Sequence, residues 1–339
     1  MRIAVTGSIA TDHLMQFPGR FAEQFVADQL ENVSLSFLVD QLEIRRGGVG
    51  ANIAYGMGQL GLAPVLVGAV GADFEEYRAW LERSGVDTKS VLVSETQHTS
   101  RFLCTTDEEQ NQIASFYAGA MSEAREIELR PVADRIGGLD LVVIGADDPA
   151  AMVRHSRECR ENGIAFAADP SQQLARLDGA DVKTLIDGAA YLFTNEYESS
   201  LLLQKTGWTA GQVLERAGEW ITTRGAKGVQ LRRRGAEPVS VAALEVADIA
   251  DPTGVGDGFR AGFFWALAAG LGRERSLQAG CTVAAAVLRS VGTQQYDVLP
   301  EEFTTQIGAA YGAEAAAEIG AALASVGIEE PPRGRHARR

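Results

Sequence analysis

The sequence lacks the patterns that mark several large classes of protein. Its three cysteines form no CxxC pair and its four histidines show no metal-ligand spacing, which argues against a structural zinc site. No uninterrupted apolar run approaches the ~20 residues that span a bilayer. The first residues also lack a signal-peptide pattern. We therefore expect a cytoplasmic protein with reduced thiols.

Positive charge is scarce as well. The net charge is −14, and the last nine residues contain four arginines and no acid, so the rest of the chain is still more acidic. Such a body repels phosphate backbones, which argues against nucleic-acid binding. Three absent motifs exclude further classes: the GxxxxGK[ST] loop, a GxGxxG after the first strand, and the HRD and DFG tripeptides of protein kinases.

Short apolar runs that alternate with helical patterns dominate the 339 residues. The runs lie at 3–7, 65–68, 141–145, 164–168 and 191–194, and the helical patterns at 52–60, 150–162 and 210–220. This alternation predicts an α/β fold with a central, mainly parallel sheet flanked by helices. Ligands of such sheets bind beyond the carboxyl ends of the strands.

A second kind of β structure is expected outside this sheet. Segments 34–39, 99–106 and 112–117 alternate with period two, which predicts antiparallel strands with one open face. We expect a small β lid over a larger domain, and an open lid edge favours a homodimer formed through two lids. The expected boundaries are 1–10, 48–94 and 120–325 for the large domain, 11–47 and 95–119 for the lid, and 326–339 for a disordered basic tail.

The stretch 251–258 (DPTGVGDG) carries the strongest chemical signal. Glycines before a helix let its unpaired N–H groups approach an anion. Asp257 would lie beside that anion, as an acceptor for a nucleophile's proton, and near a helix N-terminus we expect it to be a weak base. The alternative is that Asp257 only caps its own helix.

Two further groups admit both a ligand-binding and a structural interpretation. Gly48 and Asn52 open a helix after a glycine-rich turn, where they either contact a ligand or form a hinge. Asp12 follows the first strand, where it either accepts two sugar hydroxyls or is a solvated loop acid.

Two more groups of candidate residues lie near the ends of later strands. Asn195 and Glu198 share a helical face and suit a hydrated Mg²⁺, although an N-cap with glutamate at its third position explains them equally well. The turn at 223–228 either lies along a nucleotide or is only a hairpin.

Together, the stretches 6–14, 166–177 and 251–263 resemble the ribokinase-like (PfkB) family of carbohydrate and nucleoside kinases. Within it, the chain is similar to the adenosine kinases of actinobacteria. The resemblance implies transfer of phosphate from ATP to the 5′-hydroxyl of adenosine, with Mg²⁺ and with K⁺ beside the anion site.

The resemblance also implies a role for each matching residue. The catalytic group comprises Asp257 as base with the backbone of Gly254, Val255 and Gly256. The substrate-binding residues are Ser8, Asp12, Ser36, Gly48, Asn52, Phe102, Phe116, Gln172 and Gln173. The ATP-binding residues are Asn195, Thr223, Gly225, Gly228 and Gly256, with Glu198 acting on Mg²⁺ through water, and Asp251 and Thr253 beside K⁺.

The identity of the acceptor rests on the lid. Phe102 and Phe116 lie in its two strands and match aromatics that clasp a purine, and the amides of Gln172 and Gln173 match the adenine edge. Taken alone, the phenylalanines favour a lid core and the glutamines fit a surface turn, so the choice of adenosine depends on the whole-chain resemblance. The alternatives to an adenosine kinase are a kinase for ribose, another sugar or another purine nucleoside, and a nucleoside-sensing protein without turnover.

Overall fold

The computed structural model describes residues 1–25 and 36–326. An eight-stranded sheet forms its centre, with neighbouring strands in the order β14-β13-β12-β11-β10-β9-β1-β4. The six strands from β12 to β4 in that order are parallel, and β13 and β14 continue antiparallel. The strands are β1 (Ile3–Thr6), β4 (Val65–Val67), β9 (Leu141–Ile144), β10 (Phe166–Ala168), β11 (Tyr191–Asn195), β12 (Glu219–Thr223), β13 (Val229–Arg232) and β14 (Val239–Val241). The predicted parallel α/β fold is confirmed.

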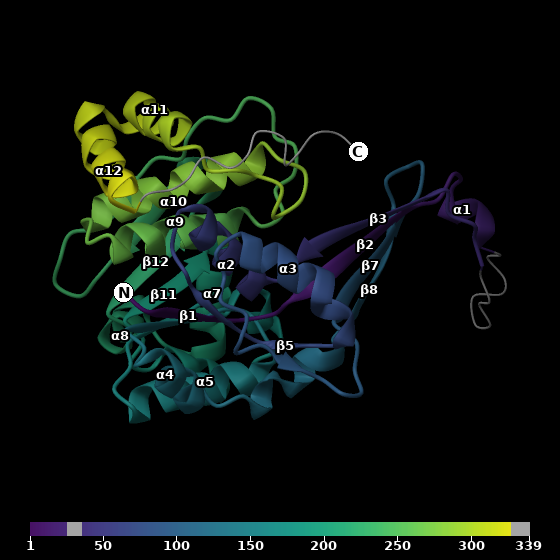
Figure 1. Cartoon of the computed structure of the whole chain (residues 1–339), viewed down its shortest axis with the longest axis horizontal. Coiled ribbons are helices and arrows are strands. Elements are labelled where there is room, and N and C mark those ends of the chain that lie inside the picture. The colour runs from purple at the N-terminus through teal and green to yellow at the C-terminus, as the bar shows by residue number, and fades with distance from the viewer. Residues whose placement is uncertain (26–35, 327–339) are drawn as a thin grey trace.

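Helices cover both faces of this sheet because successive strand side chains point to opposite sides. Val5 and Phe193 belong to one buried core, whereas Ala4 and Leu192 belong to the other. The first core packs under α2 (Val49–Gln59), α3 (Glu75–Arg83), α9 (Val255–Ala268), α10 (Arg273–Leu288), α11 (Pro300–Tyr311) and α12 (Ala313–Val326). The second packs under α4 (Leu129–Ile136), α5 (Pro149–Glu161), α6 (Gly179–Ile186), α7 (Glu196–Thr206) and α8 (Ala210–Arg216). Figure 1 shows the resulting layers.

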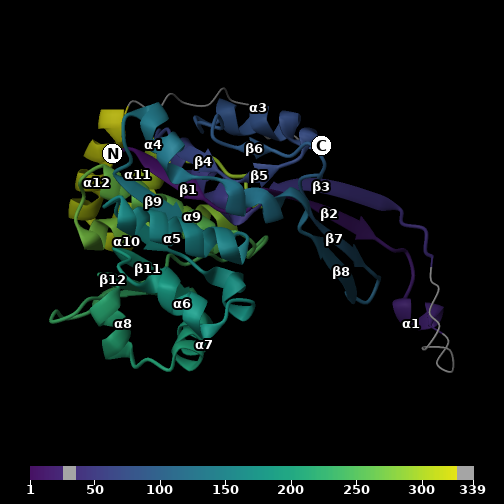
Figure 2. The ribbon, with the colours of Figure 1, turned by 90° about the horizontal axis from the view of Figure 1, so that it is seen from below.

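A four-stranded sheet, which we call the lid sheet, reaches out from this body (Figures 1 and 2). The strand order of the lid sheet is β3-β2-β7-β8. Three further short elements are the helix α1 and the strands β5 and β6, which form a separate two-stranded sheet. The bounds are β2 (Ala10–Gln16), β3 (Gln41–Gly47), β7 (Ser100–Thr106), β8 (Gln112–Tyr117), α1 (Phe21–Gln24), β5 (Ala69–Val70) and β6 (Leu92–Val93). Because β2 and β7 run parallel, the expectation of a purely antiparallel lid is wrong.

Two predicted elements are placed differently in the structure. The helix expected over 210–220 ends at Arg216, and β12 begins at Glu219. Trp220 and Ile221 are buried in opposite cores, so this strand has no polar alternation to distinguish it from a helix.

The lid strand expected at 34–39 is Gln41–Gly47 instead, with 34–35 outside the described residues and 36–39 outside any strand. In β3 the apolar side chains of Leu42 and Ile44 are exposed, whereas the polar Arg45 faces a cavity. This reversal of the usual pattern conceals the strand in the sequence.

The structure divides into the central sheet and the lid sheet, but the exact domain boundaries expected from the sequence stay predictions. Of the tail expected at 326–339, only Val326 is described, as the end of α12. No helix within 1–25 and 36–326 has both the length and the apolar character needed to cross a membrane.

Candidate active site

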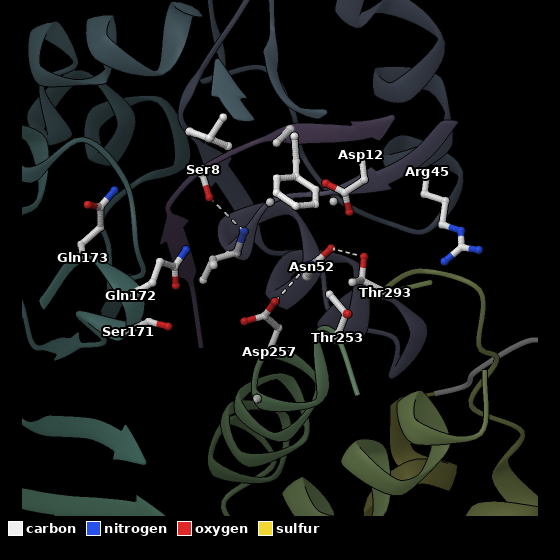
Figure 3. A pocket seen from close by; sticks show the side chains of 18 of the residues that line it. Ser8, Asp12, Arg45, Asn52, Ser171, Gln172, Gln173, Thr253, Asp257 and Thr293 are labelled. Carbon is white, nitrogen blue, oxygen red and sulfur yellow. Dashed lines mark hydrogen bonds between the residues drawn. The ribbon is translucent and has the colours of Figure 1, made fainter. Parts of the chain in front are cut away.

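A cavity of about 880 Å³ opens where the lid sheet meets the carboxyl ends of the parallel strands. Ser8 follows β1, Asn195 ends β11 and Thr223 ends β12, and all three border it. The start of α9 forms its floor (Figure 3). The cavity therefore lies at the edge of the sheet where α/β folds bind ligands.

The start of α9 is built to leave its first amides unpaired. Gly254 precedes the helix with φ 77°, and a Cβ at this residue would lie 2.7 Å from Thr293 Cγ2, so only glycine fits. No side chain among the described residues caps α9, and Asp257 lies within its first turn. The interpretation of Asp257 as the helix cap is therefore wrong. The free N–H groups are available to an anion in the cavity.

A hydrogen-bond network holds the Asp257 side chain (Figure 3). Asn52 Nδ2 donates to Asp257 Oδ2 at 2.8 Å. Asn52 Oδ1 in turn accepts from Thr293 Oγ1 at 2.8 Å and from Gln294 Nε2 at 2.9 Å. The Asn52 amide therefore orients the Asp257 carboxylate, and two hydrogen bonds to Asn52 Oδ1 fix the orientation of the amide itself. The other N–H of that amide remains available to a ligand hydroxyl.

The protein environment makes Asp257 more basic than the sequence suggests. Burial raises the pKa of Asp257 to about 7, against the hydrogen bond from Asn52 and the positive charge of Arg260, which both lower it. This direction differs from the expectation of a weak base, because desolvation outweighs the hydrogen bond from Asn52 and the charge of Arg260. A carboxylate with a pKa near neutrality is suited to accept a proton in catalysis.

One face of the lid sheet brings three expected substrate residues together. Asp12 lies opposite Phe102 in the β2–β7 register, and Phe102 lies opposite Phe116 in β7–β8. All three border the cavity, and neither ring belongs to a buried core. Asp12 is part of a strand and not a loop acid, and burial raises its pKa to about 6 against the opposing charge of Arg45.

Ser8 and Gly48 lie together at the start of α2. The backbone N–H of Val49 donates to Ser8 Oγ at 3.0 Å. Gly48 has φ 95°, and a Cβ at this residue would lie 2.5 Å from Ser8 O, so the backbone approaches too closely for any side chain. Both residues border the cavity.

Asn195 and Glu198 form the capping box that was one of the two interpretations of their spacing. Glu198 N donates to Asn195 Oδ1 at 2.7 Å, and Asn195 N donates to Glu198 Oε2 at 2.8 Å. Both nevertheless border the cavity, as do Thr223 and Gly225. The second carboxylate oxygen of Glu198 remains free of the cap, and burial raises the pKa of Glu198.

The two expected metal sites differ in their surroundings. In the part of the chain that the structure describes, no three His, Cys, Asp or Glu side chains converge, so a Mg²⁺ beside Glu198 would take its other ligands from water and phosphate. Asp251 accepts from Thr253 N at 2.9 Å and from Gly292 N at 3.2 Å, and Arg45 Nη1 lies 3.5 Å away. The Arg45 guanidinium donates twice to Glu43 and therefore does not settle the charge at Asp251, so K⁺ beside Asp251 and Thr253 stays a prediction.

Three expected site residues do not border the cavity: Ser36, Gly228 and Val255. Ser36 is exposed ahead of β3. Gly228 follows the β12–β13 turn, where any side chain would collide with the backbone of Val241. Val255 is the first residue of α9. Gln172 and Gln173 both border the cavity.

Comparison with known proteins identifies the family. Residues 8–301 match the model of the pfkB family carbohydrate kinases. The chain belongs to the PfkB family. It is a nucleoside or sugar kinase of that family, in agreement with the predicted fold and reaction class.

Individual PfkB relatives include kinases for nucleosides and for ribose. A nucleoside kinase of Methanothermobacter thermautotrophicus is 29% identical over 79% of this chain and 86% of its own length. A ribokinase of Haemophilus influenzae is 24% identical over 86% of this chain and 94% of its own. The structure of Burkholderia thailandensis nucleoside kinase in complex with inosine superposes with a TM-score of 0.78 and 31% identity, covering 92% of this chain and 98% of that one.

Several cavity residues of this PfkB kinase were not expected from the sequence. Arg45, Arg176, Arg260 and Thr293 all border the cavity, and Gln294 supports Asn52 from behind. Arg260 alone left a signal, since it is the one charged residue in the otherwise apolar stretch 258–272. The others lie in irregular segments or in the unrecognised strand β3, where spacing carries little information.

Proposed function

We propose that this PfkB kinase transfers the terminal phosphate of ATP to the 5′-hydroxyl of adenosine, giving AMP and ADP. The observation that carries the proposal is the position of Asp257. Its carboxylate has a raised pKa, is directed by Asn52, and lies beside the uncapped start of α9 in a cavity bordered by two phenylalanines.

The chemistry follows from these groups. The 5′-hydroxyl gives its proton to Asp257 while its oxygen forms a bond to the γ-phosphorus of ATP. The bond from that phosphorus to the β–γ bridging oxygen breaks, and ADP leaves with the electron pair. The amides of Gly254 to Gly256 and the dipole of α9 stabilise the charge on the transferring group.

The lid sheet and the helix after β10 supply the binding energy for the acceptor. The Asp12 carboxylate is suited to accept hydrogen bonds from the two ribose hydroxyls, with Ser8, Gly48 and Asn52 at the same end of the cavity. Phe102 and Phe116 are placed to stack on a base, a contact worth about 1–3 kcal/mol per base. Gln172 and Gln173 offer amides to the base edge.

The opposite end of the cavity is assigned to ATP. Asn195, Thr223 and Gly225 border it there. Glu198 would hold Mg²⁺ through water, and the ion would neutralise charge on the phosphates.

A 6-oxopurine nucleoside is a second candidate acceptor, and Arg176 favours it. A guanidinium only donates hydrogen bonds, so it matches the O6 and N7 acceptors of a 6-oxopurine better than the amino group of adenine. Arg176 borders the cavity four residues beyond Gln172. The related Burkholderia kinase, at 31% identity, forms a complex with inosine.

An acceptor screen tests both candidates and the remaining alternatives. Purified protein would be incubated with γ-labelled ATP, Mg²⁺ and either adenosine, inosine, guanosine or ribose, with Asp257→Asn as the matched inactive control. We expect labelled AMP as the main product. A preference for inosine would replace adenosine by the second candidate, transfer to ribose alone would make the protein a sugar kinase, and no transfer to any acceptor would support a sensing role without turnover.

A further inference from the structure

A buried ion pair lies directly under the proposed site of transfer. Arg260 is 5% exposed and Asp169 is fully buried, although Arg260 lies in α9 among the apolar residues that follow Asp257, and Asp169 directly follows the central strand β10. Moving two charges out of water is unfavourable, and replacing such pairs by apolar side chains is often neutral or stabilising. Stability alone therefore gives a weak reason for this pair.

The guanidinium of Arg260 joins two parts of the site. Its Nη2 donates to Asp169 Oδ1 at 2.6 Å, and its Nε also contacts the same carboxylate. Its Nη1 donates to the carbonyl oxygen of Gly256 at 2.9 Å, and its plane lies over the ring of Phe193 at 5.4 Å. One planar group therefore connects the end of β10 to the first turn of α9.

The fit between Arg260 and Gly256 is close. A Cβ at Gly256 would lie 2.9 Å from Arg260 Nη1, so a side chain there would displace the guanidinium or the turn. Because Asp169 holds the other edge of the guanidinium, there is little room for it to move away. The position of the Arg260 guanidinium therefore explains why residue 256 is a glycine.

Arg260 also places a positive charge among three acidic side chains near the floor of the cavity. Asp257, Asp169 and Glu198 all interact electrostatically with it. It borders the cavity itself, although it makes its hydrogen bonds to the protein.

We propose that Arg260 is a positioning residue for phosphoryl transfer: anchored by Asp169, it fixes the first turn of α9 so that the anion-binding amides and the Asp257 carboxylate keep their mutual geometry. This proposal rests on the proposed function of the site as a place of phosphoryl transfer, but not on the identity of the acceptor. It predicts that the pair matters more for turnover than for folding.

A double variant separates these two roles. Arg260→Met alone leaves Asp169 buried without its partner, so it is expected to unfold more readily and is not decisive. Asp169→Asn combined with Arg260→Met removes both charges and keeps the side-chain volumes similar. We expect this double variant to melt near the wild-type temperature while kcat falls about 10- to 100-fold, a loss like that seen when the hydrogen-bond partners of metal ligands are mutated. The KM for the acceptor should change little.

Two single variants complete the set. Arg260→Lys keeps the charge but cannot donate from a fork to both Asp169 and Gly256, so it should restore only part of kcat. Arg275→Met is the matched control, because Arg275 also lies on a buried helix and pairs with Glu318, but does not border the cavity. Its kcat should equal that of the wild type. A double variant with both wild-type melting temperature and wild-type kcat would overturn the proposal.

A binding measurement keeps this test independent of the acceptor. ADP and AMP-PNP differ by the γ-phosphate, so the ratio of their Kd values in the presence of Mg²⁺ measures how strongly the first turn of α9 binds that phosphate. We expect the double variant to lose preference for AMP-PNP while its Kd for ADP stays close to that of the wild type. An unchanged ratio contradicts the positioning role. If the wild type transfers phosphate to no acceptor, the proposed function fails, and this ratio still decides whether Arg260 shapes the anion site.

Discussion

The floor and the lid of the cavity are built in opposite ways. On the floor, Asp257 is held by Asn52, and Asn52 is held by Thr293 and Gln294, so each polar group has a fixed direction before any ligand arrives. In the lid sheet, the carboxylate of Asp12 accepts no hydrogen bond from the residues that the structure describes. Pre-organised groups suit the chemical step, whereas unpaired ones suit recognition. The contrast assigns reaction to the floor and acceptor choice to the lid.

Removal of the carboxylate on the floor should have the largest effect. We expect Asp257→Ala to lower kcat by about 10²- to 10⁴-fold, the usual contribution of a positioned base. Adenosine should still bind, because its proposed contacts in the lid sheet, at the start of α2 and after β10 do not include Asp257. Steady-state turnover and calorimetric titration with adenosine measure the two quantities separately. A variant with near-normal kcat would show that the floor does not carry the chemistry.

Truncation of the lid should affect KM instead. Phe102→Ala removes a stacking contact of about 1–3 kcal/mol, so KM for adenosine should rise about 5- to 150-fold while KM for ATP changes little. Leu103→Ala is the matched control, because Leu103 follows in the same strand but does not border the cavity. Equal increases in KM for both substrates would remove the assignment of base recognition to the lid.

The pH dependence tests the floor without a mutation. Burial raises the pKa of Asp257 to about 7, and the base must be ionised to accept a proton. Activity should therefore be complete above this pH and be lost as the pH falls through it, with kcat/KM decreasing about tenfold per pH unit. Initial rates between pH 5 and 9, in buffers that keep the fold intact, provide the measurement. A kcat/KM that stays constant down to pH 5 would contradict this expectation and indicate a carboxylate as acidic as an ordinary surface aspartate.

The sequence predicts the floor better than the lid for a physical reason. The first turn of α9 is a local structure, so the glycines at 254 and 256 predict an anion site from their spacing, while the role of Asp257 as base is implied by the family resemblance. Asn52 and Gln294 meet only through the tertiary fold. Their contact leaves no pattern in a single sequence.

In the lid sheet, the usual alternation is reversed, since β3 exposes Leu42 and Ile44 and turns Arg45 to the cavity. Rules based on buried apolar faces place such a strand wrongly. The raised pKa of Asp257 cannot be predicted from the sequence either, because burial is a property of the folded chain and here exceeds the opposing effects of Asn52 and Arg260. Ser36 shows the limit of transferring a role by resemblance, since it does not border the cavity.

The outer face of the lid sheet gives the last prediction, with the smallest expected effect on catalysis. Leu42 and Ile44 are 57% and 58% exposed there, an unusual position for apolar side chains in a water-facing strand. If two lids pair in a homodimer, Ile44→Lys should shift the protein towards monomer in light scattering after size exclusion. Val93→Lys, at an apolar position 45% exposed outside the lid sheet, should not. A wild type that is monomeric at micromolar concentration would contradict the homodimer. Because Ile44 points away from the cavity that Arg45 borders, a monomeric variant with full kcat would show that the two faces of one sheet serve assembly and recognition separately.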